Sequence, residues 1–294
     1  ENYTSEKGLS QNSCYSIEQD SDGFIWFGTQ DGLNRYDGNQ FKVYLPQNQI
    51  GRNLPSNFIS SLYFDKVQKL LWVGTIQGIC IYNPAHDSLY KVTDIYPYAQ
   101  SIKDCDVKKI ISFDKDEYWV VTYSKGLIRL NTLDKKEVVF FSDTANSKKV
   151  TSVTKWNGRI IASVQQRLYE LNVSSAGKSV KNLLPVTKFP EIKELYSYKK
   201  QLWIGTLNYG IYIAEAQGKD TIITSLSTSG GAGCFTVDNG GKIWIGTRGN
   251  GIKIYDPATK DLATTVSKSE NDRTLGKNFV LSLFTDRQGI IWAG

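Results

Sequence analysis

The residues of this chain that could do chemistry are aspartates placed in short turns ahead of a tryptophan. Asp20, Gly23 and Trp26 form the pattern Asp-x-x-Gly-x-x-Trp. Two carboxylates that face each other across a cleft can hydrolyse a glycosidic bond. Asp and Gly are also the residues that a tight turn favours, so the pattern has a structural explanation as well. Distances between carboxylates cannot be read from a sequence, and a carbohydrate-cleaving enzyme therefore stays an open alternative.

Nucleophilic and metal chemistry find little support. His86 is the only histidine, and it follows Asn83-Pro84 in a turn between two expected strands, a poor position for a Ser-His-Asp triad. The four cysteines include no Cys-x-x-Cys pair, so a zinc site is not predicted. A disulfide between Cys80 and Cys105 is left open. We therefore predict no catalytic residue, no metal and no cofactor.

The elements that would position any site come from a repeat. The segment Trp26-Phe27-Gly28-Thr29 recurs, in strong or degenerate form, along the whole chain. Its copies begin at Trp72, Trp119, Ile161, Trp203, Trp244 and Trp292. Neighbouring copies lie 41 to 48 residues apart. That period is typical of a four-stranded propeller blade, at about 40–50 residues.

Each repeat has the same internal order. An apolar strand is followed by a turn, a second strand with the tryptophan, a short turn ending in Gly, a third strand, and a more polar fourth strand. Gly and Asx supply the positive φ that such hairpins need. The sequence predicts an all-β fold, a seven-bladed β-propeller, as a single domain over residues 1–294. The predicted blades are 12–45, 57–93, 106–141, 150–184, 193–226, 234–266 and 278–294 plus 1–5.

The seventh blade is incomplete in this sequence. Residues 278–294 supply its first two strands, and Asn2-Tyr3-Thr4 resembles the fourth-strand segment Lys42-Val43-Tyr44. We expect this N-terminal strand to close the last blade. Because no third strand follows, we interpret the chain as a fragment of a longer protein.

Composition limits the functional classes. The chain has 35 Lys and Arg against 29 Asp and Glu, a net charge of +6, with the basic residues scattered. No basic helix or RNA-binding motif appears, so nucleic acid is not an expected partner. No apolar run approaches the ~20 residues of a membrane span. The modest positive charge favours, at most, weak attraction of an anionic ligand such as an acidic sugar.

Residues with suitable chemistry for ligand binding are expected on one face of the propeller. Loops that enter each first strand and turns that join the second and third strands share that face, and binding residues commonly lie on loops held by a rigid scaffold. Aromatic rings and planar polar groups suit sugar recognition. The predicted ligand-binding residues are Gln30, Asp31, Arg52, Tyr98, Tyr123, Lys125, Arg167, Asn208, Tyr209, Arg248 and Asn250.

The repeats resemble a known family. The segment GLSQNSCYSIEQDSDGFIWFGTQDGLNRYDG, residues 8–38, is similar to the two-component regulator propeller repeat, and the resemblance covers nearly the whole chain. It implies the N-terminal sensor propeller of a Bacteroidetes hybrid two-component system, periplasmic and part of an inner-membrane protein. It further implies a second propeller and an immunoglobulin-like domain in the same chain, a homodimer when intact, and a histidine kinase as the whole protein.

The resemblance implies a function without catalysis in this fragment. The expected role is a sensor module that detects an oligosaccharide from a complex glycan and signals across the membrane to control glycan-utilisation genes. The open alternatives are a propeller glycosidase or lyase, whose Asp turns superficially resemble the Asp boxes of sialidases, and a protein-interaction scaffold. The scaffold alternative rests on shape alone, because the Gly-His and Trp-Asp signatures of WD repeats are missing.

Overall fold

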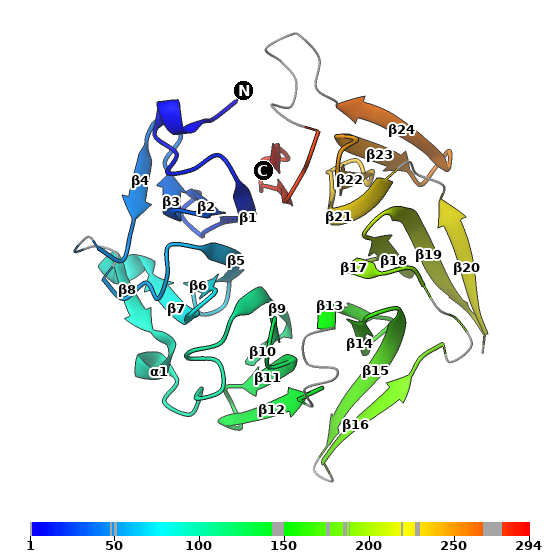
Figure 1. Cartoon of the computed structure of the whole chain (residues 1–294), viewed down its shortest axis with the longest axis horizontal. Helices are drawn as coiled ribbons and strands as arrows, with labels where there is room; N and C mark the ends of the chain where they lie inside the picture. Colours follow the sequence, from blue (N-terminus) through cyan, green and yellow to red (C-terminus); the bar gives the residue numbers. More distant parts are fainter. Residues whose placement is uncertain are drawn as a thin grey trace. The chain divides into compact units, whose positions relative to one another are not determined.

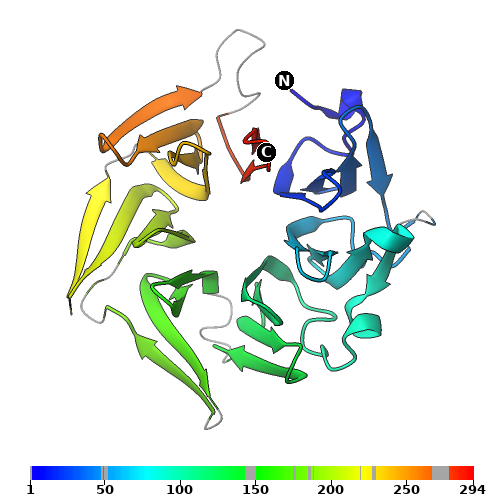
Figure 2. The same cartoon turned by 180° about the vertical axis from the view of Figure 1, so that it is seen from behind.

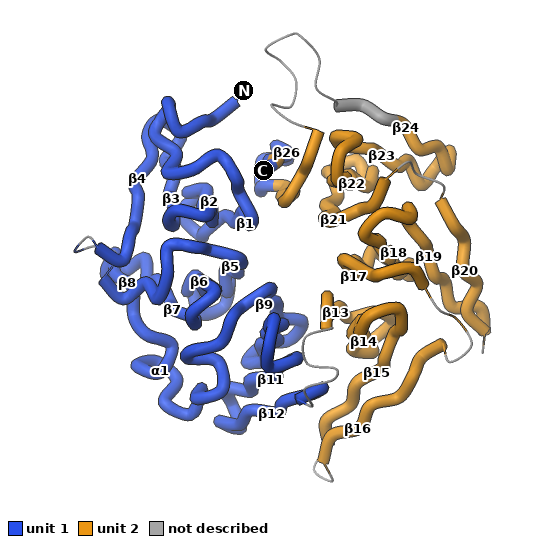
Figure 3. Tube along the Cα trace, in the orientation of Figure 1, with its two compact units in different colours: residues 1–148, 286–292, 294 blue, residues 149–285, 293 orange. Residues whose placement is uncertain are grey.

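Short antiparallel strands follow one another along the whole described chain (Figure 1). The computed structural model describes residues 2–47, 49, 52–142, 150–174, 177–184, 187, 189–218, 220–226, 230–266 and 278–294, without the side chains of 264–266. The chain divides into two compact units, coloured separately in Figure 3. Unit 1 contains residues 1–148, 286–292 and 294, and unit 2 contains residues 149–285 and 293.

Unit 1 holds three four-stranded sheets in which each strand pairs with the next along the chain. The first contains β1 (Cys14–Gln19), β2 (Ile25–Thr29), β3 (Gly32–Tyr36) and β4 (Phe41–Tyr44). The second contains β5 (Ile59–Asp65), β6 (Leu70–Thr75), β7 (Gly78–Asn83) and β8 (Ser88–Lys91). The third contains β9 (Val107–Asp114), β10 (Glu117–Thr122), β11 (Leu127–Asn131) and β12 (Lys136–Phe140). Its helical turns are η1 (Ser5–Lys7), η3 (Pro84–His86) and α1 (Val92–Ile95).

Unit 2 repeats the same plan, and Figure 2 shows the strands from behind. Its first sheet contains β13 (Val150–Trp156), β14 (Arg159–Val164), β15 (Arg167–Ser174) and β16 (Gly177–Asn182). The next contains β17 (Ile192–Tyr198), β18 (Gln201–Thr206), β19 (Tyr209–Gln217) and β20 (Asp220–Leu226). The last contains β21 (Gly230–Val237), β22 (Ile243–Thr247), β23 (Ile252–Asp256) and β24 (Asp261–Val266). A short parallel pairing of Tyr209 and Gly210 in β19 with Gly230 and Gly231 in β21 joins these last two groups of four strands into one eight-stranded sheet. Two short strands end the chain, β25 (Leu283–Thr285) and β26 (Ile291–Ala293).

These sheets confirm the predicted all-β fold built from four-stranded units. The interpretation of the chain as a single domain, with the blade limits given above, stays a prediction. One prediction within the last blade needs correction: Asn2–Thr4 form no strand. The segment runs directly into the helical turn η1 (Ser5–Lys7), where the Thr4 carbonyl oxygen accepts from the Lys7 backbone N–H at 2.9 Å, so Thr4 caps this turn.

The repeated Gly explains how successive sheets pack. A methyl group at Gly28 would come within 2.7 Å of Ile59, at the start of the next sheet, and one at Gly74 within 2.5 Å of Val107. In unit 2 a methyl group at Gly205 would lie 2.5 Å from the Ala232 carbonyl oxygen. The first strand of each of these following sheets therefore packs directly against the backbone of the Gly, which leaves no room for a side chain.

The Asp and Trp of the repeat are joined by a side-chain hydrogen bond. The Asp20 carboxylate accepts hydrogen bonds from the Trp26 indole Nε1 at 2.7 Å and from the backbone N–H groups of Asp22 and Phe24 at 3.0 Å. The same indole bond forms between Trp244 and Asp238, and between Trp292 and Asp286, at 2.8 Å each. These aspartates hold turns and tryptophans in place, so the Asp-x-x-Gly-x-x-Trp pattern is structural here.

The second repeat lacks this hydrogen bond between Asp and Trp. Its turn is one residue longer, and the Asp65 carboxylate accepts from the Tyr118 hydroxyl instead of from Trp72. Trp72 is fully buried, and its Nε1 has no hydrogen-bond partner among the described residues. The Trp72 ring is stacked against Tyr118 and Tyr96, with centroid distances of 4.1 and 5.4 Å.

Residues 286–292 pack on the first sheet within unit 1. The Arg287 backbone N–H and Nε donate to Gln19 Oε1 at 2.9 and 3.2 Å. Its guanidinium also donates to the carbonyl oxygens of Asp20 at 2.6 Å and Ser21 at 3.1 Å. The rings of Trp292 and Tyr3 lie 5.9 Å apart. The two ends of the sequence therefore meet on this sheet, although the N-terminal segment is not a strand.

All four cysteines lie in the described part of the chain, and none forms a disulfide. Cys14, Cys80 and Cys105 are buried, and Cys234 is partly exposed. The Cys80–Cys105 bridge that the sequence left open is therefore not formed in this structure.

Candidate functional site

Each complete sheet carries a β-bulge near the start of its first strand. In β1, pairing with β2 jumps from Cys14 to Ser16, and the register of β5, β9, β13, β17 and β21 shifts at the equivalent place. The unpaired residues in unit 1 are Tyr15, Ser60 and Lys108, and those in unit 2 are Thr151, Lys193 and Gly233. Bulges at a sheet rim redirect side chains and often border binding sites.

Two of the bulge residues of unit 1 lie beside aromatic rings. The Tyr15 ring is 4.7 Å from the Phe58 ring, and the Lys108 ammonium nitrogen lies 5.6 Å from the centre of the Tyr123 ring. Tyr123 is 48% exposed, and burial of its hydroxyl together with the neighbouring Tyr15 raises its pKa. We call Tyr15, Phe58, Lys108 and Tyr123 the aromatic cluster.

The turns beside this cluster are fixed by the Thr of the repeat. Thr29 Oγ1 donates to the Gly32 carbonyl oxygen at 3.0 Å, and Thr122 Oγ1 donates to that of Gly126 at 2.9 Å. The same Oγ1 atoms accept from backbone N–H groups within their turns, at Asp31 and Lys125. The conformation of these second-to-third-strand turns is therefore set by the repeat motif, while the residues at their tips differ between the repeats.

Polar groups at these turns are linked to neighbouring loops. Asn57 Nδ2 donates to the Asp31 carboxylate at 3.0 Å, and the Ser124 hydroxyl donates to Asp106 at 2.8 Å. The Lys125 ammonium donates to the Ser101 carbonyl oxygen at 3.2 Å. Carboxylate, amide and ammonium groups thus lie at the same strand ends as the aromatic cluster.

The structure places the predicted residues of unit 1 in two regions. Gln30 and Asp31 are exposed in the β2–β3 turn, and Tyr123 and Lys125 are exposed in the β10–β11 turn. Arg52 is exposed in the loop between β4 and β5. Tyr98 forms the second region, near the turn between β11 and β12.

The Tyr98 hydroxyl donates to the Thr132 carbonyl oxygen at 3.3 Å, in the turn between β11 and β12. That turn is at the opposite end of β11 from Tyr123 and Lys125. Tyr98 is also partly buried against the hydrophobic core. The structure therefore does not bring Tyr98 together with the other predicted residues of unit 1.

The predicted residues of unit 2 lie at or beside the corresponding turns. Arg167 begins β15, and Asn208 and Tyr209 lie where β18 turns into β19, with Tyr209 68% exposed. The Arg248 guanidinium lies 4.9 Å from the Phe279 ring centre, and Asn250 lies in the same β22–β23 turn as Arg248.

Lys193 extends this group. It is the bulge residue of β17, and burial and the positive charge of Arg248 together lower its pKa. The positive charges of Arg248 and Lys193 are therefore near enough to repel each other.

Four residues of interest were missed by the sequence reasoning: Tyr15, Phe58, Lys108 and Lys193. Tyr15, Lys108 and Lys193 each lie second in a first strand, where the repeat pattern assigns them to a regular ladder, and Phe58 directly precedes β5. The signal that could have found the first three is the position after the repeated apolar residue, as in Cys14-Tyr15, Val107-Lys108 and Ile192-Lys193. Only a bulge makes that position different from its neighbours.

No group of three or more His, Cys, Asp and Glu side chains in the described part of the chain has an arrangement that could hold a metal ion. None of the described helices is long and apolar enough to cross a membrane. His86 lies in η3 and is exposed.

Comparison with known proteins connects this fold to signalling. A family model described as the two-component regulator propeller matches residues 8–31. The extracellular domain of a putative hybrid two-component system from B. thetaiotaomicron is 26% identical, with a TM-score of 0.82 over 100% of this chain and 40% of that one. A second such domain from the same organism is 21% identical and has a TM-score of 0.77 over 98% of this chain and 38% of that one.

A curated relative gives a short match. A histidine kinase of Formosa agariphila is 55% identical over 42 residues, which is 14% of this chain and 3% of that protein. The chain thus spans less than half of each of these three proteins. Its repeat, its four-stranded sheets and its likeness to the extracellular domain from B. thetaiotaomicron lead to one conclusion: the chain has a β-propeller fold that is similar to the extracellular domains of two-component systems, with a two-component regulator propeller repeat at residues 8–31.

Proposed function

We propose that this chain is the non-catalytic, ligand-binding part of an extracytoplasmic sensor, and that its ligand is an oligosaccharide released from a complex glycan. The aromatic cluster carries this proposal. Tyr15, Phe58 and Tyr123 offer rings at one set of strand ends, and Lys108, Asp31 and Asp106 add charged groups beside them. Sugars present C–H patches to aromatic rings and hydroxyls to planar polar groups.

The wider setting of the proposal rests on the family. The whole protein would be a histidine kinase of the inner membrane with this propeller in the periplasm, a second propeller and an immunoglobulin-like domain in the same chain, and two copies in the active receptor. Its output would be control of glycan-utilisation genes. Binding transmits a signal only if the ligand binds two arrangements of the receptor unequally.

Calorimetric titration with neutral and acidic oligosaccharides tests the proposal. The protein is used in the longest form that can be purified, with the 294-residue chain in parallel. For a sugar that binds, Tyr123→Ala and Tyr15→Ala should each weaken binding about tenfold, or about 1.4 kcal/mol. Tyr90→Ala is the matched control, because Tyr90 is a partly exposed tyrosine of β8 outside the cluster.

The outcomes separate the alternatives. Binding by the longer form alone would place the site on, or shared with, other domains. A double variant, Tyr209→Ala with Arg248→Ala, tests the predicted residues of unit 2 in the same assay. Hydrolysis of any oligosaccharide would favour an enzyme, and binding of a protein with no sugar response would favour a scaffold. Silence towards all sugars in both forms would refute the sensor proposal.

A further inference from the structure

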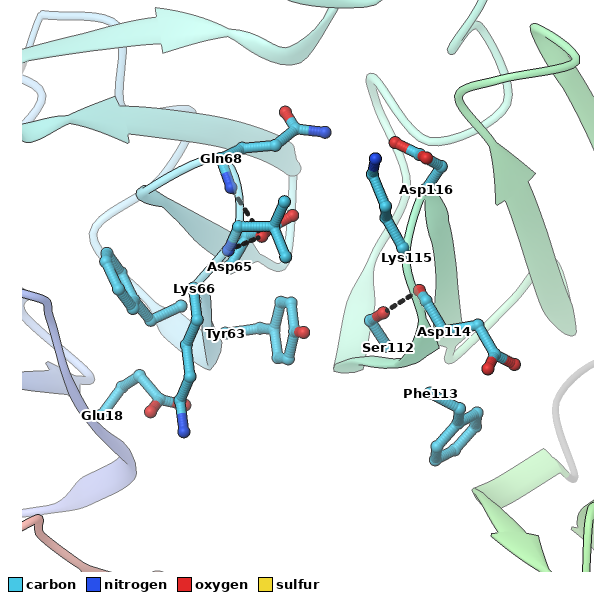
Figure 4. A pocket seen from close by; sticks show the side chains of 12 residues that line it. Glu18, Tyr63, Asp65, Lys66, Gln68, Ser112, Phe113, Asp114, Lys115 and Asp116 are labelled. Atoms are coloured by element: carbon cyan, nitrogen blue, oxygen red, sulfur yellow. Dashed lines mark hydrogen bonds between the residues drawn. The ribbon is translucent and has the colours of Figure 1, made fainter.

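A cavity of about 450 Å³ opens in unit 1, far from the aromatic cluster along the strands (Figure 4). It is lined by the last part of β5 and β9, by the turns that follow them, and by Glu18 near the end of β1. The aromatic cluster lies at the starts of the same first strands. The cavity is therefore a separate place on unit 1, and none of the predicted ligand-binding residues lines it.

The cavity has two facing walls (Figure 4). Tyr63 and Lys66 lie on one side, and Ser112, Phe113 and Lys115 lie on the other. Tyr63 is partly buried, and its ring meets Tyr118 edge-on at a centroid distance of 6.2 Å. The cavity thus has an aromatic ring in each wall, and one of them is held by core packing.

The turns that form the walls are held by their own hydrogen bonds. The Asp65 carboxylate accepts from the backbone N–H groups of Val67 at 2.7 Å and Gln68 at 2.9 Å. The Ser112 hydroxyl donates to the Asp114 carbonyl oxygen at 2.8 Å. These contacts form the walls in advance, which lowers the entropy cost of binding.

Glu18 adds a carboxyl group whose charge changes near neutral pH. Burial raises the pKa of Glu18 to about 7, while the Lys66 ammonium acts to lower it. A carboxyl group that is partly protonated near neutral pH can both donate and accept hydrogen bonds.

The remaining charges of the lining are mixed. Two lysines, Lys66 and Lys115, are interspersed with three aspartates, Asp65, Asp114 and Asp116, so apart from Glu18 the lining has an excess of only one negative charge. Aromatic rings, a hydroxyl, an amide and mixed donors and acceptors suit a molecule with many hydroxyl groups and no net charge. The volume lies in the range of ligand pockets, about 300–1,000 Å³.

We infer that this cavity is a second binding site of unit 1, for a neutral mono- or disaccharide. The ligand class rests on the proposed function, whereas the cavity and its chemistry do not. The site would let one propeller unit hold a sugar at each end of its strands.

Saturation-transfer NMR with lactose, cellobiose and maltose tests the inference, with glucuronate and spermidine as anionic and cationic comparisons. The protein is again used in its longest purified form. Lys115→Trp covers the opening from an exposed turn position, and Tyr63→Ala removes one ring. Each should weaken binding of the responding disaccharide at least tenfold. Tyr90→Ala is the control, and thermal melts confirm that each variant is folded.

Each result decides one way. Loss of binding in both cavity variants, with Tyr123→Ala unchanged, supports the second site. Loss in Tyr123→Ala alone would overturn it and leave the proposed function intact. Binding that survives Lys115→Trp, a response to glucuronate or spermidine alone, or no response to any neutral disaccharide would also overturn it. The proposed function is refuted only if the calorimetric titrations also detect no binding of any oligosaccharide.

Discussion

Asp20 shows how a residue that looks catalytic serves the fold. Its carboxylate accepts three hydrogen bonds and is almost fully buried. An amide has only one oxygen to offer, so Asp20→Asn leaves either the Trp26 indole or the two backbone N–H groups without an acceptor. We expect a loss of about 2 kcal/mol in the free energy of unfolding.

Urea unfolding followed by circular dichroism measures this loss. Asp31→Asn is the matched control, because Asp31 is exposed and makes one side-chain contact to Asn57. Its effect should stay within about 0.5 kcal/mol. Equal losses in the two variants would contradict a structural role for the repeated Asp.

Glu18 gives a pH-dependent stability. Its pKa is about 7 in the folded protein against an ordinary 4.5, so folding favours the protonated form. The favourable contribution is complete below about pH 4.5 and is lost as the pH rises through 7. Glu18→Gln stays neutral throughout, and at pH 8 it should be more stable than the parent by about 3 kcal/mol.

Urea midpoints at pH 5 and pH 8 check the sign. The advantage of Glu18→Gln should be much smaller at pH 5. Glu6→Gln, at an exposed position of η1, should show no such difference. A constant advantage at both values of pH would mean that ionisation of Glu18 is not the cause.

Single residues were predictable where the repeat constrains them. The repeat places a tryptophan in the second strand, and Trp26, Trp72, Trp119, Trp156 and Trp203 are fully buried, whereas Trp244 and Trp292 are partly exposed. Ligand residues were harder to predict, because their roles depend on neighbours that the sequence does not bring together. Tyr98 lies at the wrong strand ends, while Tyr15 and Lys108 were missed.

At the scale of the element, the Gly of the second strand sets the distance between sheets. A methyl group at Gly205 would lie 2.5 Å from a backbone oxygen of β21 and 3.0 Å from the Phe235 ring. Backbone cannot move aside as a flexible side chain can. Gly205→Ala should therefore destabilise the protein by about 1–3 kcal/mol.

Gly233→Ala is the matched control, because no atom lies within 4 Å of a methyl group placed there. Its effect should range from none to a gain of about 0.5 kcal/mol. Differential scanning calorimetry compares the two variants. Equal melting temperatures of Gly205→Ala and Gly233→Ala would show that lack of space for a side chain is not the reason for Gly at position 205.

The strands and turns were readable from the sequence, and the bulges were not. Gly, Asx and alternating apolar residues mark the turns and strands directly. A bulge changes which residue pairs with which, and the same letters fit either register. The residues that the bulges redirect were therefore invisible until the pairing of β1, β9 and β17 was known.

At the scale of the whole molecule, the far end of the sequence is held on the first sheet within unit 1. Arg287 makes four hydrogen bonds to Gln19, Asp20 and Ser21. Arg287→Ala removes the three that its side chain makes. We expect hydrogen exchange of amides in residues 286–292 and 20–24 to become at least tenfold faster, because local opening then costs less free energy.

Hydrogen–deuterium exchange with mass spectrometry resolves these segments. Lys242→Ala is the control, since it removes a surface ion pair with Asp256 at 3.2 Å, a kind of contact that contributes little. Unchanged exchange in both segments of Arg287→Ala would show that ring packing around Trp292 is sufficient to hold them.

The family resemblance and the repeat period gave the fold, but not how the chain ends are held. The sequence predicted an N-terminal strand because Asn2-Tyr3-Thr4 resembles a fourth strand. The structure instead holds this region through the rings of Tyr3, Tyr36 and Trp292. Ring contacts of this kind leave no pattern in the sequence, because they join residues from distant positions.

The unpaired indole of Trp72 has a spectroscopic consequence. The emission of an indole shifts to longer wavelengths when polar groups can reorient around its excited state. Trp72 is buried between Tyr96 and Tyr118 with no partner at Nε1 among the described residues, so it should emit at the blue edge of the protein's fluorescence. Because the Tyr118 ring also contacts Tyr63, the fluorescence of Trp72 should report changes in the wall of the cavity.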